Sequence, residues 1–442
     1  MENILIYYPF EENRRLSFAA RHIFENTLGI GFSIVDRREA FLNYVGPAIN
    51  YSKENLDKGL QIIPKGLLEE TGISPKKALK VSEWKTVFCF FSEERGDIPF
   101  DLFSATFYLL SSYEEYGSAE LDEHGRFNYH HSLLFTHNCL EIPVVDRWAY
   151  LLKEEIFQKY PGTKFNLRKF RFVSTFDIDF PYQYRKRKLI RRVGGMAKDL
   201  IQLRFGDFIK RIAVYFHWQE DPYRKAIQNI NDFHEKNGKI HTFFILLDSK
   251  GKYGNAADFP LTDYYKNLPT LKLATIGLHP SYNTYKNLEL LIKEKQKLGN
   301  LLNRKITSSR QHFLRMNVPA TFQELAIAGI QNDFSLLFAK APGFRSGTAI
   351  PYSFYDIEKE SVTNLTIHPT CVMDSTFIFH LKTSPEESLQ RIKSLIDECK
   401  KSGGDYISLW HNSNLAGSRS KNPWIDVFTA SFAYASAFEK ND

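Results

Sequence analysis

The stretch Ser-Thr-Phe-Asp-Ile-Asp-Phe at residues 174–180 is the part of the chain on which its fold and function depend. An apolar, β-prone run ends here in two acids, Asp177 and Asp179, spaced i, i+2. Side chains at this spacing share one face of a strand. Two carboxylates at a strand end can converge as a metal ligand and a general base. Two solvated acids at an ordinary strand end are the alternative, and the stretch alone leaves both open.

Length and composition indicate a water-soluble protein of at least two domains. The 442 residues are 43% hydrophobic and 25% charged, and exceed what one ordinary core can hold. The net charge of +7 is mild for this size, so we expect no nucleic-acid partner. The four cysteines are scattered and form no metal-binding pair, which fits a reducing compartment. With neither a signal sequence nor a transmembrane segment expected, the predicted location is the cytoplasm.

The first 165 residues predict a smaller α/β domain. Strand-like runs near residues 4–8, 31–35 and 87–91 alternate with a helical pattern over residues 16–28. Residues 117–147 are polar and contain four histidines, whose spacing fits no ligand pattern and which we expect to be exposed. Pro161 and Gly162 then end a helix, so we place the domain boundary between residues 165 and 166.

Residues 166–442 predict repeated β–α units and hence a parallel, barrel-like sheet. Strands are expected near residues 172–176, 241–247, 273–278, 308–314, 362–367 and 406–410. In such a sheet the chemistry gathers at the carboxyl ends of the strands. The polar residues found at these ends are Asp177 and Asp179, Asp248, His279, His312, His368 and His411. This recurrence favours a functional site over two solvated acids.

Four motifs follow one another along this region. They are Thr-Phe-Asp-Ile-Asp at residues 175–179, Thr-Phe-Phe at 242–244, Thr-Ile-Gly-Leu-His-Pro-Ser-Tyr-Asn at 275–283 and Leu-Trp-His at 409–411. In their order and spacing they resemble the polysaccharide deacetylase, or NodB-homology, family. The resemblance implies a distorted (β/α) barrel over residues 166–442. Residues 1–165 lie outside it and are similar to an uncharacterised domain that precedes some bacterial deacetylase-like domains.

The resemblance implies a site around one divalent metal ion, with zinc expected. Asp179 and His279 correspond to metal ligands, Asp177 to the catalytic base and His411 to the catalytic acid. The family's second metal-binding histidine is replaced here by Asn283, and an amide oxygen is a poor ligand for a zinc-like ion. His312 is the candidate replacement, and the sequence leaves open whether His312 or Asn283 completes the site. Ile178 and Pro280 also depart from the family motifs.

Three arginines and two acids are further candidates. The segment that contains Arg310 and Arg315 occupies the place of an arginine motif of the family, so either could orient the catalytic acid. Arg345 lies between glycines and could bind a substrate carboxylate or phosphate, or form an ordinary ion pair in a turn. Asp374 and Asp333 could contact and orient the residues of the site, although structural roles are the simpler interpretation.

The predicted function is metal-dependent removal of an acetyl group from an N-acetylated sugar or polysaccharide precursor, as the resemblance implies. The basic run at residues 184–193 is either a solvated helix face or a rim that holds a phosphorylated or lipid-linked carbohydrate. Two alternatives stay open. The same fold could hydrolyse other C–N or ester bonds, or it could be a degenerate, non-catalytic barrel that binds glycans.

Overall fold

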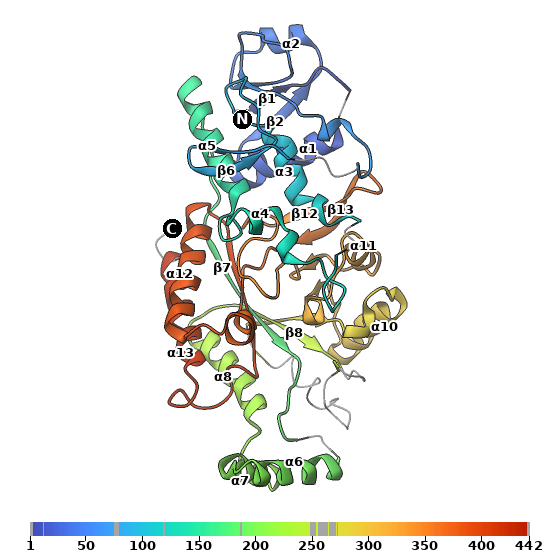
Figure 1. The fold of residues 1–442 in the computed structure, drawn as a ribbon, viewed down its shortest axis with the longest axis vertical. Helices are drawn as coiled ribbons and strands as arrows, with labels where there is room; N and C mark the ends of the chain where they lie inside the picture. The colour runs from blue at the N-terminus through green and yellow to red at the C-terminus, as the bar shows by residue number, and fades with distance from the viewer. Residues whose placement is uncertain are drawn as a thin grey trace.

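The computed structural model of the chain describes residues 3–11, 13–74, 79–117, 120–185, 188–247, 253–254, 264, 271 and 273–439. The molecule is elongated, with a small sheet at one end, a large sheet in the middle and a helical hairpin projecting at the other end (Figure 1). The predicted Asp248 lies outside the described residues. Within the described part of the chain, every helix is too short or too polar to cross a bilayer.

The small sheet is parallel, with the strand order β2-β1-β3-β4. Its strands are β1 (Asn3–Tyr7), β2 (Gly31–Val35), β3 (Ala48–Tyr51) and β4 (Leu60–Ile62). The principal helices around it are α1 (Arg14–Arg21), which continues as a π-helix at His22–Leu28, α3 (Leu102–Leu110) and α5 (Val144–Lys159). The hairpin of β5 (Val81–Trp84) and β6 (Val87–Phe90) lies beside α5. The alternation of strands and helices predicted here is therefore confirmed.

Gly29 ends the first helical segment in the left-handed region, at φ 63°. A Cβ atom there would lie 1.8 Å from the carbonyl oxygen of Asn166, in the segment that leads to the large sheet. Only glycine permits this approach.

The large sheet has nine strands in the order β12-β13-β11-β10-β9-β8-β7-β15-β14. They are β7 (Arg171–Ile178), β8 (His241–Leu246), β9 (Ala274–His279), β10 (Ser308–Ser309), β11 (Asn332–Asp333), β12 (Tyr352–Asp356), β13 (Ser361–Ile367), β14 (Val372–Met373) and β15 (Asp405–His411). All neighbours are parallel except β12 and β13. The predicted parallel sheet with helices around it is present. Among the described residues the outer strands β12 and β14 do not pair with each other, so closure of the predicted distorted barrel is not shown.

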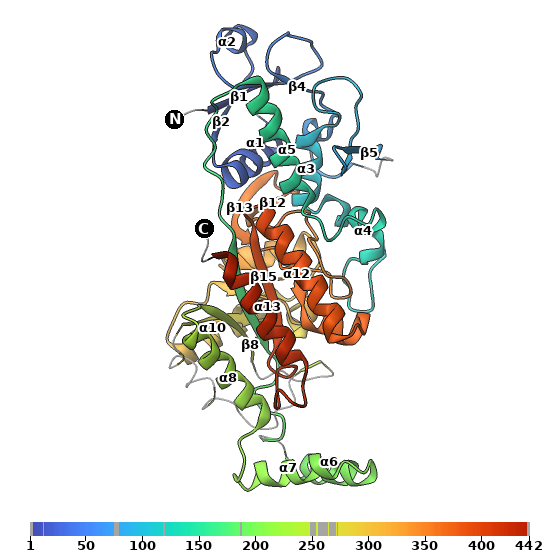
Figure 2. The ribbon, with the colours of Figure 1, turned by 90° about the vertical axis from the view of Figure 1, so that its left-hand side faces the viewer.

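Helices cover this sheet because strands buried on both faces need apolar cover. α12 (Pro385–Lys401) and α13 (Trp424–Glu439) lie side by side over β15, with α8 (Pro222–Lys236) below them (Figure 2). Asp221 caps α8, and Ser384 caps α12 with a complete capping box. α10 (Leu288–Leu302) and α11 (Ala320–Ile327) connect the following strands.

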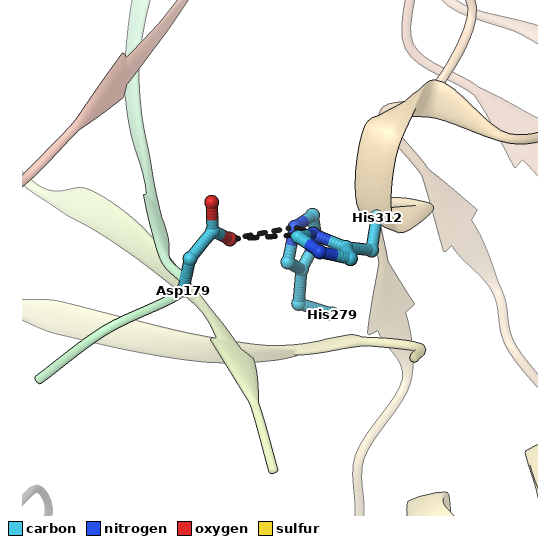
Figure 3. A group of neighbouring side chains, drawn as sticks. All are labelled: Asp179, His279 and His312. Carbon is cyan, nitrogen blue, oxygen red and sulfur yellow. Dashed lines mark hydrogen bonds and ion pairs between the residues drawn. The ribbon is translucent and has the colours of Figure 1, made fainter. Parts of the chain in front are cut away.

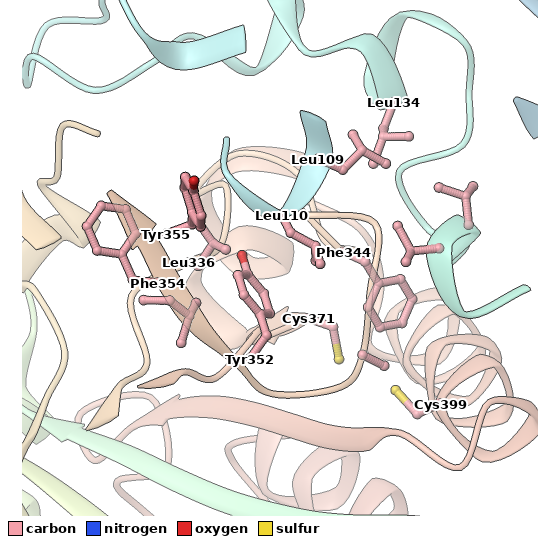
Figure 4. Packing of buried hydrophobic residues seen from close by; sticks show 14 of the residues in the cluster. Leu109, Leu110, Leu134, Leu336, Phe344, Tyr352, Phe354, Tyr355, Cys371 and Cys399 are labelled. Carbon is pink, nitrogen blue, oxygen red and sulfur yellow. The ribbon is translucent and has the colours of Figure 1, made fainter. Parts of the chain in front are cut away.

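One hydrophobic core runs through both sheets. Figure 4 shows Leu110 of α3 between Phe344 and Tyr352 of the large-sheet region, in the same hydrophobic cluster. Buried ion pairs also cross between the two parts, since Arg345 of the large-sheet region pairs with Glu115. The division at residues 165 and 166 stays a prediction, but the core itself does not stop there.

Candidate metal centre

The site lies where the central parallel strands end. Asp177 is the second-last residue of β7 and pairs in register with His411 of β15. Their side chains therefore start from neighbouring strands. Asp179 follows two residues later, as the chain leaves the sheet. His279 is the last residue of β9, two strands from β7. The parallel register therefore brings four of the predicted residues to one edge of the sheet.

His312 reaches the same point because the strand before it is short. The predicted strand over residues 308–314 is wrong after Ser309, where β10 ends. The chain then forms the 3-10 turn His312–Leu314, in which Phe313 and Leu314 have positive φ values of 62° and 50°. Bulky residues rarely adopt this conformation, and such strain occurs mostly at functional sites. The turn directs His312 toward the end of β9.

Three side chains converge on one point (Figure 3). Asp179 Oδ1 lies 3.2 Å from His279 Nε2 and 3.4 Å from His312 Nδ1. The two imidazole nitrogens are 3.1 Å apart. Among the described residues this is the one group of His, Cys, Asp or Glu side chains with ligand atoms close enough to share a metal ion.

Hydrogen bonds on the far sides of both rings set their tautomers. His279 Nδ1 lies 2.6 Å from the carbonyl oxygen of Arg310, and His312 Nε2 lies 3.0 Å from that of Tyr253. A carbonyl oxygen only accepts, so each of these outer nitrogens carries a proton and donates it. In the neutral rings the inner nitrogens, His279 Nε2 and His312 Nδ1, therefore present lone pairs to each other and to Asp179.

This donor set fits a cation. Asp179 Oδ1 is buried without a hydrogen-bond partner among the described residues, despite its two imidazole neighbours. Lone pairs that face one another in a buried site repel unless a positive charge lies between them. Two imidazoles oriented by backbone carbonyls and one carboxylate form a usual ligand set for zinc, with a position left open.

The pKa shifts of the ligands agree with a site built for positive charge. Burial alone would raise the pKa of Asp179, but His312 and His279 lower it well below its usual value. Burial alone would lower the pKa of His279, yet Asp177 and Asp179 raise it. The acids around His279 thus favour a positive charge at this point. A metal ion would displace the ring proton, because a ligating imidazole is neutral.

Arg310 holds Asp177 in place. Its guanidinium group is fully buried, and Nη1 donates to Asp177 Oδ1 at 3.1 Å and to Thr175 Oγ1 at 2.8 Å. Its Nε donates to the carbonyl oxygen of Phe334 at 3.0 Å. Asp177 Oδ2 remains on the metal side, 3.7 Å from His279 Nε2. One residue thus orients both Asp177, through its side chain, and His279, through its carbonyl group.

Asp374 holds His411 in a comparable way. Asp374 Oδ1 accepts from His411 Nδ1 at 2.7 Å, and Asp374 Oδ2 accepts from the His411 backbone at 2.8 Å. His411 Nε2 then faces the site, 3.9 Å from Asp179 Oδ2. Burial alone would lower the pKa of His411, but Asp374, followed by Asp179 and Asp177, raises it to about 10. The ring is therefore protonated at neutral pH.

Three candidates are not brought to the site. Asn283 is exposed, in the 3-10 turn Tyr282–Thr284 that follows β9. Arg315 donates to the carbonyl oxygens of His124 and Tyr282 and stacks on tyrosine rings, so it does not contact Asp177. Arg345 pairs with both carboxylate oxygens of Glu115, at 2.8 and 2.6 Å. The anion-binding interpretation of Arg345 is not supported, because its guanidinium group already has a carboxylate partner.

Two other residues predicted near the strand ends are structural. His368 Nε2 donates to Asn332 Oδ1 at 2.9 Å and the ring stacks on Phe334, and burial lowers the pKa of His368 to about 4. Asp333 accepts hydrogen bonds from Ser309 and Ser335 and joins β10 to β11. Neither residue belongs to the group around Asp179.

The sequence gives no sign of several supporting groups. The carbonyl oxygens of Tyr253 and Phe334 orient His312 and Arg310, and any residue type could supply them. Asn414, which donates to Asp374 Oδ2 at 3.0 Å, lies three residues after His411 and outside the motif. Thr175 lies in the stretch 174–180, two residues before Asp177 and on the same face of the strand. This position is the sequence signal from which its role could have been found.

Comparisons with known proteins give a partial picture. A family model described as a family of unknown function (DUF7033) matches residues 4–161. No curated protein shows significant sequence similarity to the chain.

Solved structures with a similar arrangement include carbohydrate deacetylases. A candidate polysaccharide deacetylase from Mycobacterium smegmatis is 12% identical, covers 60% of this chain and 84% of its own, and has a TM-score of 0.37. IcaB from Ammonifex degensii is 16% identical, with 38% and 86% coverage and a TM-score of 0.24. Agd3, described as a novel carbohydrate deacetylase, is 9% identical, with 98% and 84% coverage and a TM-score of 0.32. Because these TM-scores are low, we infer function from the site itself.

Proposed function

We propose that the protein is a metal-dependent hydrolase that removes an acetyl group from an N-acetylated sugar or polysaccharide precursor. One observation carries the proposal. A carboxylate oxygen and two imidazole lone pairs converge without a partner, flanked by one acid that an arginine holds and one histidine that an aspartate holds. The order of the sequence motifs supports the choice of acetyl hydrolysis within this class.

Asp179, His279 and His312 would hold the cation, with zinc as the expected ion. A divalent cation in this position supplies Lewis-acid activation of a water molecule and of a carbonyl oxygen. Asp179 is 18% exposed at its side chain, whereas His279 and His312 are 1% and 5% exposed. The ligands are thus fixed by packing, and the one accessible ligand marks the side from which a substrate enters.

Asp177 is the proposed base. Arg310 occupies its Oδ1, which leaves Oδ2 as the oxygen that can accept a proton from water. The buried ion pair with Arg310 fixes the carboxylate group and orients its free oxygen. An amide at this position keeps the hydrogen bond to Arg310 but cannot take the proton.

His411 is the proposed acid. Its Nδ1 is engaged by Asp374, so Nε2 carries the proton that faces the site. Hydrolysis of an amide requires a proton on the departing nitrogen, and the protonated ring can supply it. Asp374 acts as a positioning residue because it fixes both the orientation and the charge of this ring.

The direct test is acetate release from N-acetylated oligosaccharides, before and after treatment with a chelator. We expect release that stops with chelator, returns with zinc and falls by a factor of about a thousand in Asp177→Asn. The matched control is Asn283→Ala, which changes the exposed residue at the family's usual ligand position and leaves activity in place.

The alternatives are separate outcomes of the same assay. Activity on O-acetyl or cyclic amide substrates alone would move the protein to another hydrolase class. Full acetate release by Asp177→Asn would refute the assigned base. A protein that binds zinc and glycans but hydrolyses none of these substrates would be a binding protein.

A further inference from the structure

The helical hairpin at the far end of the molecule is amphipathic, and its apolar side chains point away from the rest of the protein. It consists of α6 (Leu189–Ile201) and α7 (Phe205–Tyr215), and Figures 1 and 2 both show it projecting away from the rest of the protein. Asp199 is the only buried residue of α6, and Val214 the only one of α7. A surface helix normally buries its apolar stripe against the core. Here that stripe faces solvent.

Exposed hydrophobic side chains are concentrated on the hairpin and the residues next to it. Eleven of the 26 exposed large hydrophobic side chains of the described residues lie within residues 189–218. They are Leu189, Ile190, Val193, Leu200, Ile201, Leu203, Phe205, Ile209, Tyr215, Phe216 and Trp218. Ile190, Ile201 and Trp218 are 85%, 82% and 75% exposed. Apolar patches of this extent on a water-soluble protein usually mark an interaction surface.

The charged side chains hold the two helices together instead. Arg211 of α7 donates to Asp199 of α6 at 2.9 Å. The same arginine lies 4.7 Å above the ring of Tyr184, and Arg192 lies 4.6 Å above that of Tyr215. These contacts place the polar faces between the helices, so the outward orientation of the apolar faces is fixed by specific pairs.

The hairpin region carries the positive charge of the whole protein. Residues 185–211 contain ten lysines and arginines and two aspartates, a net charge of +8, whereas the complete chain has +7. A pocket lined by Arg185, Arg192, Arg211, Tyr184 and Tyr215 lies at the inner side of the hairpin. The Nε atoms of Arg185 and Arg192 are buried without a hydrogen-bond partner among the described residues. Buried guanidinium donors of this kind suit a phosphate group.

We propose that the α6–α7 hairpin docks the protein onto an anionic membrane surface. Exposed Ile, Phe and Trp side chains above a cluster of lysines and arginines are the composition of helices that lie in the interface plane of a bilayer. The basic residues attract anionic headgroups, and the pocket arginines bind their phosphates. With 13 and 11 residues, the two helices are too short to span the bilayer.

Two other binding partners of the hairpin would account for only one of its two features, the exposed apolar side chains or the positive charge. A second copy of the chain would cover the apolar faces but bring two +8 segments together, which is unfavourable. A nucleic acid would match the charge, but would leave the exposed isoleucines and phenylalanines in water. An anionic bilayer satisfies both features at once.

The hairpin also lies close to the candidate metal centre along the chain. β7 runs toward this end of the molecule, and only nine residues separate Asp179 from Leu189 (Figure 1). Docking would therefore bring the carboxyl ends of the strands to the membrane surface. The docking proposal does not depend on the proposed function, since lipid binding can be measured whether or not the protein is a hydrolase.

The test uses the full chain and vesicles of phosphatidylcholine, with or without phosphatidylglycerol. We expect co-sedimentation with the phosphatidylglycerol vesicles, weaker binding at high salt and little binding to pure phosphatidylcholine. The emission of Trp218 should shift to the blue on binding, and this shift should be absent in Trp218→Phe. No binding to phosphatidylglycerol vesicles would overturn the proposal.

Variants separate the hairpin from general surface hydrophobicity. The combined change Ile190→Ser, Ile201→Ser, Phe205→Ser and Phe216→Ser should weaken vesicle partition at least about a hundredfold. The matched control is Val45→Ser, Phe157→Ser, Ile327→Ser and Phe379→Ser, which removes four exposed hydrophobic side chains elsewhere and should leave binding intact. Equal loss in both variants would overturn the proposal.

A charge variant tests the choice of anionic lipid. Lys198→Glu, Arg204→Glu and Lys210→Glu together should lower binding about a hundredfold, with unchanged thermal unfolding because all three residues are exposed. Unchanged partition in this variant would contradict the electrostatic part. A concentration-dependent dimer in sedimentation velocity that the serine variant abolishes, without vesicle binding by the wild type, would show a second copy as the occupant.

Discussion

Two regions of this protein bury charged or titratable side chains, but these side chains are paired in one region and not in the other. At the interface between the two sheets, Arg345 meets Glu115 and Arg15 meets Glu360, and each guanidinium group has a carboxylate partner. At the metal centre, Asp179 Oδ1 and the lone pairs of His279 and His312 face one another, and Asp179 Oδ1 has no hydrogen-bond partner among the described residues. Buried polar groups cost free energy unless they are matched. The unmatched region is therefore the one that we assign to function.

The largest expected effect comes from removing a donor at the metal centre. His279→Ala should abolish zinc binding and lower kcat/KM by more than about ten thousandfold, because one of three proposed ligands is lost. Thermal unfolding in the presence of chelator should change far less than the activity. Normal zinc content and normal activity in His279→Ala would show that the metal centre, like the interface between the sheets, has only a structural role.

The interface should show the opposite pattern, a large effect on stability. Arg345→Met leaves Glu115 buried without its partner, and we expect a loss of about 3–5 kcal/mol in the free energy of unfolding. The double variant Glu115→Gln, Arg345→Met should recover part of this loss, because no buried charge is left unpaired. Denaturant unfolding of the single and double variants gives both numbers. Equal stability of the wild type and Arg345→Met would contradict the structural role of the pair.

The interface also contains an acid whose charge is unfavourable. Burial, followed by the neighbouring Glu115, raises the pKa of Glu114 to about 7. Because the folded pKa lies above the unfolded value, its contribution is fully present below about pH 4.5 and is lost as the pH rises through 7. The free energy of unfolding of the wild type should therefore fall between pH 5 and pH 8, and in Glu114→Gln this fall should be smaller by up to about 3 kcal/mol. Parallel stability–pH curves for the two proteins would contradict this assignment.

The smallest predicted effect concerns a positioning residue of the site. Asp374→Asn should lower kcat about 10- to 100-fold, because His411 keeps a hydrogen-bond partner but loses its compensating charge. Asp374 raises the pKa of His411, so its removal should move the alkaline limb of the pH–rate profile to lower pH. A lower kcat without this displacement would indicate a purely structural role.

The sequence predicted the site better than the sheet that carries it. Asp177, Asp179, His279 and His411 could be located because each follows a recognisable apolar strand and parallel strands share their carboxyl edge. His312 could be named as the alternative to Asn283 because an imidazole is the better zinc ligand. Whether the predicted distorted barrel closes could not be read from the sequence, because closure depends on pairing between strands that are distant along the chain.

Other features depend on contacts that no local pattern contains. Arg310 was predicted within a strand and Arg345 between glycines. Neither pattern shows that Arg310 faces Asp177 or that Arg345 faces Glu115, which lies 230 residues away in sequence. The early end of β10 at Ser309 follows from inward hydrogen bonds of Arg310, not from β-propensity. The basic run before α6 was recognised from its charge, but the outward apolar face depends on the pairing of Asp199 with Arg211.

Isothermal titration of zinc into chelator-treated protein tests the central claim most directly. We predict binding of one zinc ion per chain in the wild type and in Asn283→Ala, and loss of that binding in His312→Ala. The result that would contradict the account is no zinc binding by the wild type, or zinc binding that His312→Ala leaves unchanged.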